Sequence, residues 1–208
     1  MILDDRALPD WLSVSRETHD RLRAFYSLVC KWNTAINLVS AASLQDGWHR
    51  HILDSAQILA ISGCDQGLWL DVGSGAGFPG LVVSIMASEA LPDLHVALVE
   101  SDRRKATFLS EAVRQLGLNA DVHADRLETY PDVRVDVLSA RAFAPLDKTL
   151  AVAARHLSED GVALFMKGQA YEAEMKVASP NWRYDCDVIP SKTDAHSVIL
   201  KVKKVRHA

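Results

Sequence analysis

The chain has few cysteines, no long apolar run and no large excess of charge of one sign. Its 3 cysteines, Cys30, Cys64 and Cys186, stand far apart, which fits neither a zinc site nor a disulfide framework, so we expect reduced thiols. Every apolar run ends well before the roughly 20 residues that span a bilayer. The residues from Met1 to Asp5 lack the basic and apolar regions of a signal peptide. These absences exclude a disulfide scaffold and a membrane protein, and they favour a cytoplasmic location.

The charge balance excludes a protein that coats nucleic acid without specificity. The 208 residues carry 23 basic and 27 acidic side chains, which gives a net charge of −4. Non-specific coating depends on neutralising many phosphates, so an acidic chain suits it poorly, although a local basic face is compatible with these numbers. With 49% hydrophobic and 24% charged residues, the composition is that of an ordinary globular domain.

No group of side chains has the spacing of a metal site. His49, His51 and Asp54 come close, but residues two apart on a helix do not face each other, and only His51 and Asp54 share a face. Buried polar groups usually find partners within the protein. We therefore expect this pair to make a structural hydrogen bond, and we expect no metal.

The first third of the chain has the hydrophobic period of helices. One apolar series has the 3.6-residue repeat over residues 22–32, and a second has it over residues 44–59. From residue 68 short apolar runs alternate with helical stretches, without a linker or an internal repeat. We expect a helical extension over residues 1–64, packed on a domain over residues 65–208 with which it forms a single structural unit.

The second part has the pattern of an α/β fold with a doubly wound, mostly parallel sheet. Strand, helix, strand in sequence implies right-handed crossovers and helices on both faces. An antiparallel pair near the end would sit at the edge of such a sheet. Strands are predicted at 68–72, 96–100, 121–123, 135–139 and 162–166, helices at 81–90, 104–116 and 146–157, and the antiparallel pair at 184–189 and 197–205.

The strongest local signal is a glycine-rich segment between the first strand and its helix. Alternate glycines let the backbone approach a ligand at the carboxyl ends of parallel strands, where such folds bind nucleosides. Asp71 precedes the glycines, and a carboxylate there would attract a sulfonium and repel a pyrophosphate, which favours S-adenosylmethionine over NAD. The candidate cofactor contacts in this segment are Asp71, Gly73, Ser74, Gly75, Gly77 and Phe78.

Two further segments belong to the same predicted pocket. Glu100, followed by Ser101, closes the second strand, and its carboxylate can accept hydrogen bonds from both ribose hydroxyls of either nucleoside class. After the third strand comes a polar loop with Arg126, Leu127 and Glu128, where Leu127 would pack on an adenine. These residues support nucleoside binding without choosing between S-adenosylmethionine and NAD.

Two motifs are missing after the fourth strand, where an acceptor would meet a methyl donor. Residues 139–146 contain no Asn/Asp-Pro-Pro-aromatic string for methylating an exocyclic amine, and no Pro-Cys that would supply a nucleophile to a pyrimidine. An acceptor that needs neither deprotonation nor covalent activation fits best. A purine ring nitrogen with a free lone pair is one.

Several of these segments together resemble the bacterial ribosomal RNA small-subunit methyltransferase G family, also called glucose-inhibited division protein B. The segments that carry the resemblance are 31–33, 37–38, 50–55, 71–80, 141–146 and 167–168, in family order. The resemblance implies a Rossmann-like enzyme that transfers a methyl group from S-adenosylmethionine to guanine N7 of 16S ribosomal RNA near the decoding centre. It assigns cofactor contacts to Gly73, Phe78, Leu127, Glu128 and Arg141.

Because guanine N7 carries no hydrogen, the implied reaction needs no general base, and we interpret Arg141 as a residue that orients the nucleotide or the cofactor. An RNA or small-subunit partner would need cations, and the candidates are Arg103, Arg104, Lys105, Lys167, Lys201 and Lys203. The family commonly has an arginine where Ala195 stands. The alternatives are a nicotinamide oxidoreductase, a non-catalytic RNA-binding assembly factor, or a methyltransferase for another RNA. We expect a monomer.

Overall fold

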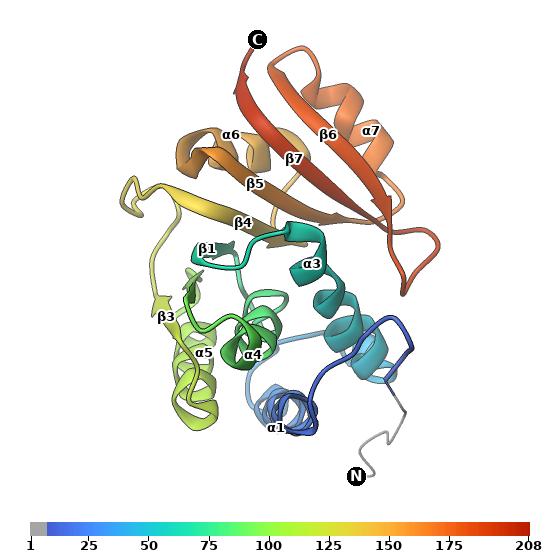
Figure 1. The fold of residues 1–208 in the computed structure, drawn as a ribbon, viewed down its shortest axis with the longest axis vertical. Coiled ribbons are helices and arrows are strands. Elements are labelled where there is room, and N and C mark those ends of the chain that lie inside the picture. Colours follow the sequence, from blue (N-terminus) through green and yellow to red (C-terminus); the bar gives the residue numbers. More distant parts are fainter. Residues whose placement is uncertain (1–7) are drawn as a thin grey trace.

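The computed structural model describes residues 8–208 as a seven-stranded sheet with helices on both faces (Figure 1). The strand order is β3-β2-β1-β4-β5-β7-β6. The strands are β1 (Gly67–Val72), β2 (Leu94–Val99), β3 (Ala120–His123), β4 (Val135–Arg141), β5 (Leu157–Lys167), β6 (Trp182–Pro190) and β7 (Val198–His207). This arrangement confirms the predicted doubly wound, mostly parallel fold.

The direction of the strands places all the candidate loops at one edge of the sheet. Strands β1 to β5 are mutually parallel, so they end together at what we call the carboxyl edge. The antiparallel pair is present as predicted, and β7 lies between β5 and β6. Lys167 pairs with Val198 in the β5–β7 register, so the start of β7 also lies at the carboxyl edge.

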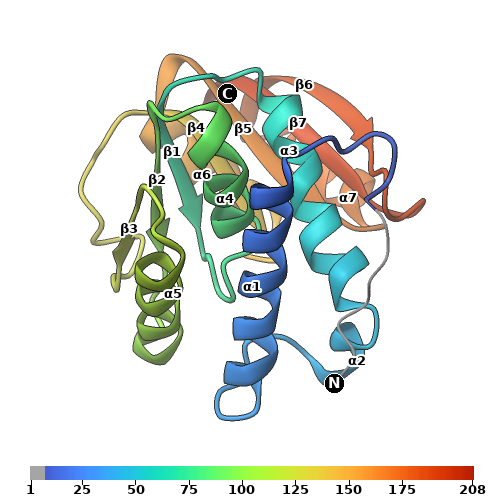
Figure 2. The same ribbon diagram turned by 60° about the horizontal axis from the view of Figure 1, so that its bottom comes forward.

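The helices cover the two faces of the sheet unequally (Figures 1 and 2). Helices α1, α3, α4 and α5 lie on one face, with α1 and α3 both packed against α4, whereas α6 and α7 lie on the other. Their bounds are α1 (Arg16–Asn33), α2 (Ala41–Leu44), α3 (Asp54–Ser62), α4 (Gly80–Ala90), α5 (Arg103–Leu116), α6 (Leu146–His156) and α7 (Tyr171–Ala178). Strand side chains alternate between the faces, so Trp69 and Leu70 belong to different buried clusters.

The N-terminal helices share a core with the rest of the protein. Helix α1 follows from the apolar repeat of the sequence, and its Leu22, Phe25 and Val29 are fully buried. Phe25 lies 5.3 Å from Phe78 and 6.5 Å from Phe108, between ring centroids. The buried cluster is therefore continuous across residue 64.

The second predicted helix is wrong in one respect. The apolar repeat over 44–59 is divided into α2, a π-helix that we call η1 (Trp48–Leu53), and α3. The amide of Asp54 donates to the carbonyls of His49 and His51 and skips that of Arg50. The hydrophobic repeat of the sequence does not reveal such a widened turn, because apolar side chains are buried both before and after the turn. Helix α7 was also not predicted.

None of the helices in residues 8–208 is long and apolar enough to cross a membrane. Within the same residues, no group of three or more His, Cys, Asp or Glu side chains is arranged to hold a metal ion. The three cysteines are free and half-buried.

Candidate active site at the carboxyl edge of the sheet

The glycine segment after β1 forms a loop whose backbone is open to a ligand. Gly73, Gly75 and Gly77 have φ of 65°, 57° and 84°, a region that other residues rarely adopt. A Cβ placed on Gly75 would meet only the carbonyl oxygen of Gly73, at 3.7 Å, so this backbone faces open space. At Gly75 the loop therefore offers a surface that a ligand can approach without a side chain in between.

Glu100 holds this loop beside the end of β2. Its Oε2 accepts a hydrogen bond from the Gly75 amide at 2.9 Å, and its Oε1 accepts from the Asp102 amide at 2.7 Å. Each carboxylate oxygen has a further lone pair, so both can still accept from a hydroxyl. The carboxylate thus joins the loop to the strand end at the position where the sequence predicted a ribose contact.

Asp71 lies beneath the glycine loop rather than at the mouth of the crevice. Its side chain has no exposed surface, and its Oδ1 accepts a 2.5 Å hydrogen bond from Ser139, whose Oγ accepts one from the Trp69 ring at 2.8 Å. Burial raises the pKa of Asp71 to about 6, against the opposing effect of the Ser139 hydrogen bond. The expectation that this carboxylate faces a ligand is wrong in position, because the side chain is fully buried and bonded to Ser139 of the neighbouring strand β4.

The loop after β3 completes this side of the carboxyl edge. Leu127 is half-buried and packs against the core, whereas Ser101, Arg126 and Glu128 are exposed. Arg155 donates to the carbonyls of Leu127, Glu128 and Tyr130, which fixes the loop to α6. Ser74 differs from these residues because it is buried and donates to the Asp71 carbonyl.

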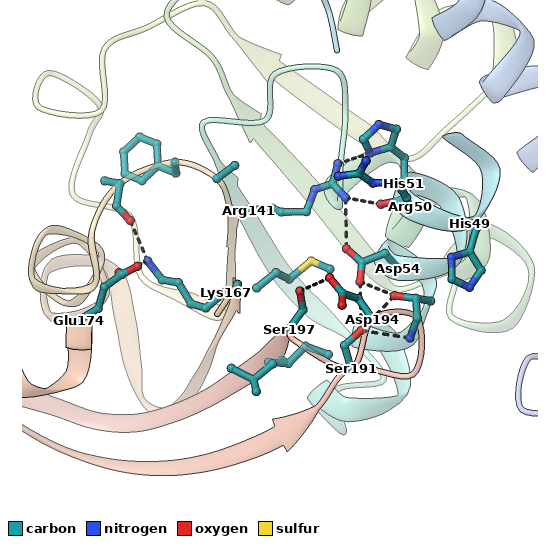
Figure 3. A pocket seen from close by; sticks show the side chains of 18 of the residues that line it. His49, Arg50, His51, Asp54, Arg141, Lys167, Glu174, Ser191, Asp194 and Ser197 are labelled. Carbon is teal, nitrogen blue, oxygen red and sulfur yellow. Dashed lines mark hydrogen bonds and ion pairs between the residues drawn. The ribbon is translucent and has the colours of Figure 1, made fainter. Parts of the chain in front are cut away.

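A pocket of about 580 Å³ lies next to the glycine loop, over the ends of β4 and β5 (Figure 3). Four segments distant in sequence line it, at residues 49–54, 141–145, 166–174 and 191–199. Arg141 and Lys167 are the predicted site residues that line this pocket, and the glycine loop does not contribute to it. The structure therefore divides the predicted site into a glycine-loop side and a separate pocket.

Arg141 ties the end of β4 to the π-helix. Its Nη1 donates to the Arg50 carbonyl at 2.9 Å and to Asp54 Oδ2 at 3.2 Å, and its Nη2 donates to His51 Nδ1 at 2.7 Å. Figure 3 shows Arg141 turned toward these residues. The Arg50 carbonyl is the one that the Asp54 amide skips, so the π-turn exposes an acceptor that the guanidinium then satisfies. The expected helix-to-helix hydrogen bond of His51 and Asp54 is therefore wrong, since each of them binds Arg141 at the end of β4 instead.

His51 is held as a neutral ring. Burial, reinforced by the charges of Arg141 and Arg50, lowers its pKa to about 3. Because an arginine only donates, Nδ1 accepts the bond, and the proton of the neutral ring is on Nε2. The ring stacks on Phe78 at 5.0 Å between centroids, and the Arg141 guanidinium lies 5.2 Å from the same Phe78 ring. The glycine loop and the pocket thus meet at Phe78 and Arg141.

The cations predicted to contact RNA lie in three different places. Lys167 lines the pocket but is occupied, since its Nζ donates to the Ala144 carbonyl and to Glu174, both at 2.8 Å. Arg103, Arg104 and Lys105 begin α5 at the carboxyl edge, where Arg104 pairs with Asp102.

Lys201 and Lys203 lie further along β7, away from this edge, and Lys201 donates to the Ile61 carbonyl at 2.7 Å. Ala195 is exposed in the β6–β7 loop that lines the pocket.

Arg50 and Phe143 are two of the pocket residues that were not among the predicted site residues. Phe143 is 37% exposed, and Arg50 is exposed where the π-helix borders the pocket. Both belong to segments that carried the family resemblance, which was the available signal. Nothing in the sequence showed that residues 50 and 143 line one cavity.

The chain is similar to known proteins in both sequence and fold. The family model of rRNA small subunit methyltransferase G matches residues 18–197. A protein of Ruegeria sp. (strain TM1040) named ribosomal RNA small subunit methyltransferase G is 48% identical over 93% of this chain and 94% of its own length. One with the same name from Cereibacter sphaeroides (strain ATCC 17025 / ATH 2.4.3) is 47% identical over 100% of both chains.

The fold resembles those of solved methyltransferases. A SAM-dependent methyltransferase from Aquifex aeolicus aligns with a TM-score of 0.58 and 18% identity, covering 85% of this chain and 97% of that one. The ribosomal protein L11 methylase of Lactobacillus delbrueckii subsp. bulgaricus aligns with a TM-score of 0.58 and 16% identity, covering 72% and 76%. Through the family match and the full-length relatives, the chain belongs to the rRNA small subunit methyltransferase G family.

Proposed function

We propose that this protein transfers a methyl group from S-adenosylmethionine to N7 of a guanine in 16S ribosomal RNA, near the decoding centre, in the cytoplasm. Membership of the family supports ribosomal RNA as the substrate. The observation that carries the proposal is the open backbone of the glycine loop, with Glu100 attached to it, directly beside a pocket of about 580 Å³. One side suits a nucleoside cofactor, and the other has room for an acceptor.

The residues on the glycine-loop side fit an adenosine-containing cofactor. Gly75 would let its amino-acid part lie against the backbone, Glu100 would accept from the ribose hydroxyls, and Leu127 would cover the adenine. Asp71 would stabilise the positive charge of the cofactor through space, because a buried carboxylate attracts a cation on the other side of the loop without contacting that cation. When bound, S-adenosylmethionine supplies a methyl group on a sulfonium, which is a reactive electrophile.

The pocket side needs to position the acceptor rather than to deprotonate it. The cofactor would supply its methyl group to the lone pair of guanine N7 and would leave as the neutral thioether S-adenosylhomocysteine, so the positive charge would pass to the purine. Arg141 remains protonated, and His51 is neutral with its Nδ1 already occupied. Neither residue is needed as a base. Holding the two reactants in line can contribute about 7–11 kcal/mol to lowering the barrier.

A negatively charged enzyme requires that RNA be bound by a limited cationic region. Arg103, Arg104 and Lys105 lie at the carboxyl edge, on the same side of the sheet as the glycine loop. We assign RNA contacts to these three cations and to the pocket residues, and none to Lys201 or Lys203.

The enzyme acts as a monomer. Phe143, Val177 and Val188 are the large hydrophobic side chains exposed in residues 8–208, and they belong to three separate elements. Extended apolar patches mark permanent interfaces, and three scattered residues do not form one. Sedimentation at micromolar concentration tests this part, and a dimer would contradict it.

The proposed activity is tested by mapping 7-methylguanosine in small-subunit ribosomal RNA from cells with and without the gene. We expect one modified guanine near the decoding centre that disappears in the deletion and returns with the wild-type gene. An unchanged modification pattern would contradict the proposal and would favour a non-catalytic assembly factor. If a methyl group disappears from a different RNA instead, the protein is a methyltransferase but 16S ribosomal RNA is not its substrate.

A further inference from the structure

The pocket beside the glycine loop has an exposed aromatic ring on its wall. Phe143 is one of three large hydrophobic residues exposed in the described part of the chain, and of these three it alone lines the pocket. Within residues 8–208 it forms no ring pair with another aromatic side chain. The core therefore does not require this ring.

The backbone before Phe143 turns the ring toward the glycine loop. Ala142, between Arg141 and Phe143, has φ of 50°, in the left-handed region of backbone conformation. Arg141 points to the π-helix, whereas the Phe143 ring lies against Gly73, where any Cβ would clash with it. A non-glycine residue with positive φ is uncommon and often marks a functional site. The ring consequently stands between the glycine loop and the pocket.

The pocket is suited in size and charge to one nucleotide. A volume of about 580 Å³ lies within the range of sites that take small organic ligands, and it exceeds the space needed for a single base. Arg50 lines the pocket with an exposed guanidinium, whereas Arg141 and Lys167 each have hydrogen-bonded partners within the protein. Arg50 is thus the arginine placed to reach a phosphate.

The geometry of RNA requires that a target N7 be brought out of a helix. The major groove of A-form RNA, which carries N7, is too deep and narrow for side chains, so enzymes act on unstacked or extruded bases. An extruded base commonly stacks on an aromatic side chain, which replaces the neighbours that it has lost. Phe143 offers such a face next to the loop that carries the proposed methyl donor.

We propose that Phe143 is the stacking face for the acceptor guanine, which enters this pocket as a single extruded nucleotide, and that Arg50 binds a phosphate beside it. The inference rests on the proposed methyl transfer and extends it by naming the residues that hold the acceptor. The Phe143 ring holds the base next to Gly73, and the base plane presents its N7 to the glycine-loop side.

The first test measures methylation kinetics of Phe143 variants with RNA as the varied substrate. We expect Phe143→Ala to lower kcat/KM for RNA about 10- to 100-fold, and Phe143→Tyr to keep it near the wild-type value, because stacking needs only an aromatic face. The dissociation constant for S-adenosylmethionine should stay unchanged in calorimetry. Val177→Ala, which removes an exposed apolar side chain outside the pocket, serves as the control and should change nothing.

Two results would overturn this role of Phe143. Wild-type kinetics of Phe143→Ala would show that the ring does not hold the acceptor. A weakened affinity of Phe143→Ala for S-adenosylmethionine, large enough to account for the whole kinetic loss, would place the ring in the cofactor site instead. If the wild type itself forms no 7-methylguanosine, the proposed function has failed, and that result is separate from both.

The second test measures how RNA binding by Arg50→Ala depends on salt. Removing one phosphate contact should lower the slope of log affinity against log salt by about 0.7, and Arg50→Lys should restore it. Lys203→Ala is the matched control, since this exposed cation lies on β7 away from the pocket. An unchanged slope for Arg50→Ala, or an equal decrease for Lys203→Ala, would overturn the assignment of Arg50.

Discussion

The two sides of the carboxyl edge are built in different ways. On the glycine-loop side, the groups available to a ligand are mostly backbone, and they come from short segments that directly follow β1 and β2. On the pocket side the groups available to a ligand are side chains from four segments. Arg141 connects two of these segments, because it bonds Arg50 and Asp54, which stand 91 and 87 residues before it in the sequence. Backbone sites depend on local conformation, whereas side-chain sites depend on tertiary packing. Mutations should therefore affect binding on the first side, and both stability and catalysis on the second.

The largest effect is expected from Gly75→Val, which should abolish measurable S-adenosylmethionine binding in calorimetry. A β-branched residue is strongly disfavoured at φ of 57°, and its side chain would occupy the open face of the loop. Gly117→Val is the matched control, since this residue at the end of α5 has φ of 61° and nothing within 4 Å of an added Cβ. It should share the strain and keep the affinity. Wild-type affinity of Gly75→Val would remove the loop from the cofactor site.

Arg141→Ala should reduce methylation far more than it reduces affinity for S-adenosylmethionine. The change leaves the Asp54 carboxylate and the Arg50 carbonyl without this donor, and the ion pair it removes has only 18% of each side chain exposed. We expect a loss of about 3 kcal/mol in the free energy of unfolding. Arg141→Lys should recover only part of both effects, because an ammonium cannot reach all three acceptors. Full RNA methylation by Arg141→Ala would contradict the positioning role.

On the pocket side, His51 should make the protein less stable in acid. Its pKa is about 3 in the folded state against 6.5 for an ordinary histidine, so the unfolded chain binds this proton first. The stability that it contributes is complete above pH 6.5 and is lost as the pH falls toward 3. We would measure the free energy of unfolding of the wild type and of His51→Asn by chemical denaturation. As the pH falls from 7 to 4.5, the value for the wild type should decrease by about 2–3 kcal/mol relative to that of the variant. A constant difference would contradict the neutral assignment.

On the glycine-loop side, Asp71 should have the opposite dependence. Its pKa is about 6 in the folded state against 3.8 for an ordinary aspartate, so folding favours the protonated form. The stability from this group is complete below pH 3.8 and is lost as the pH rises through 6. Between pH 4 and pH 7 the free energy of unfolding of Asp71→Asn should therefore rise by about 2 kcal/mol relative to that of the wild type, measured by the same chemical denaturation. Parallel curves for the two proteins would show that Asp71 is not perturbed.

The smallest effect is expected from Lys201→Met, which tests a residue outside both sides. The variant loses one hydrogen bond to the Ile61 carbonyl at the end of α3 and should lose about 1 kcal/mol in the free energy of unfolding. Its RNA affinity and salt dependence should equal those of the wild type. A reduced salt slope would return Lys201 to the RNA contacts that the sequence suggested.

The same contrast explains what the sequence predicts and what it does not. The glycine loop, Glu100 and the strand ends were predictable, because positive φ, strand length and parallel order all leave local signals. The burial of Asp71 was not predictable. Because β1 is buried on both faces, the alternation of its side chains does not show which face the loop covers. The π-helix was missed for a related reason. Its widened turn frees the Arg50 carbonyl, and the apolar repeat of the sequence carries no signal of which carbonyl is free.

The division of the carboxyl edge is tested most directly by a structure of the protein with S-adenosylhomocysteine. We expect the ligand to lie against the loop from Gly73 to Phe78, with its ribose hydroxyls on Glu100, and the cavity between Arg141 and Lys167 to stay open. A ligand bound inside that cavity, or a glycine loop that makes no contact with the ligand, would show that the cofactor site is not on the glycine-loop side.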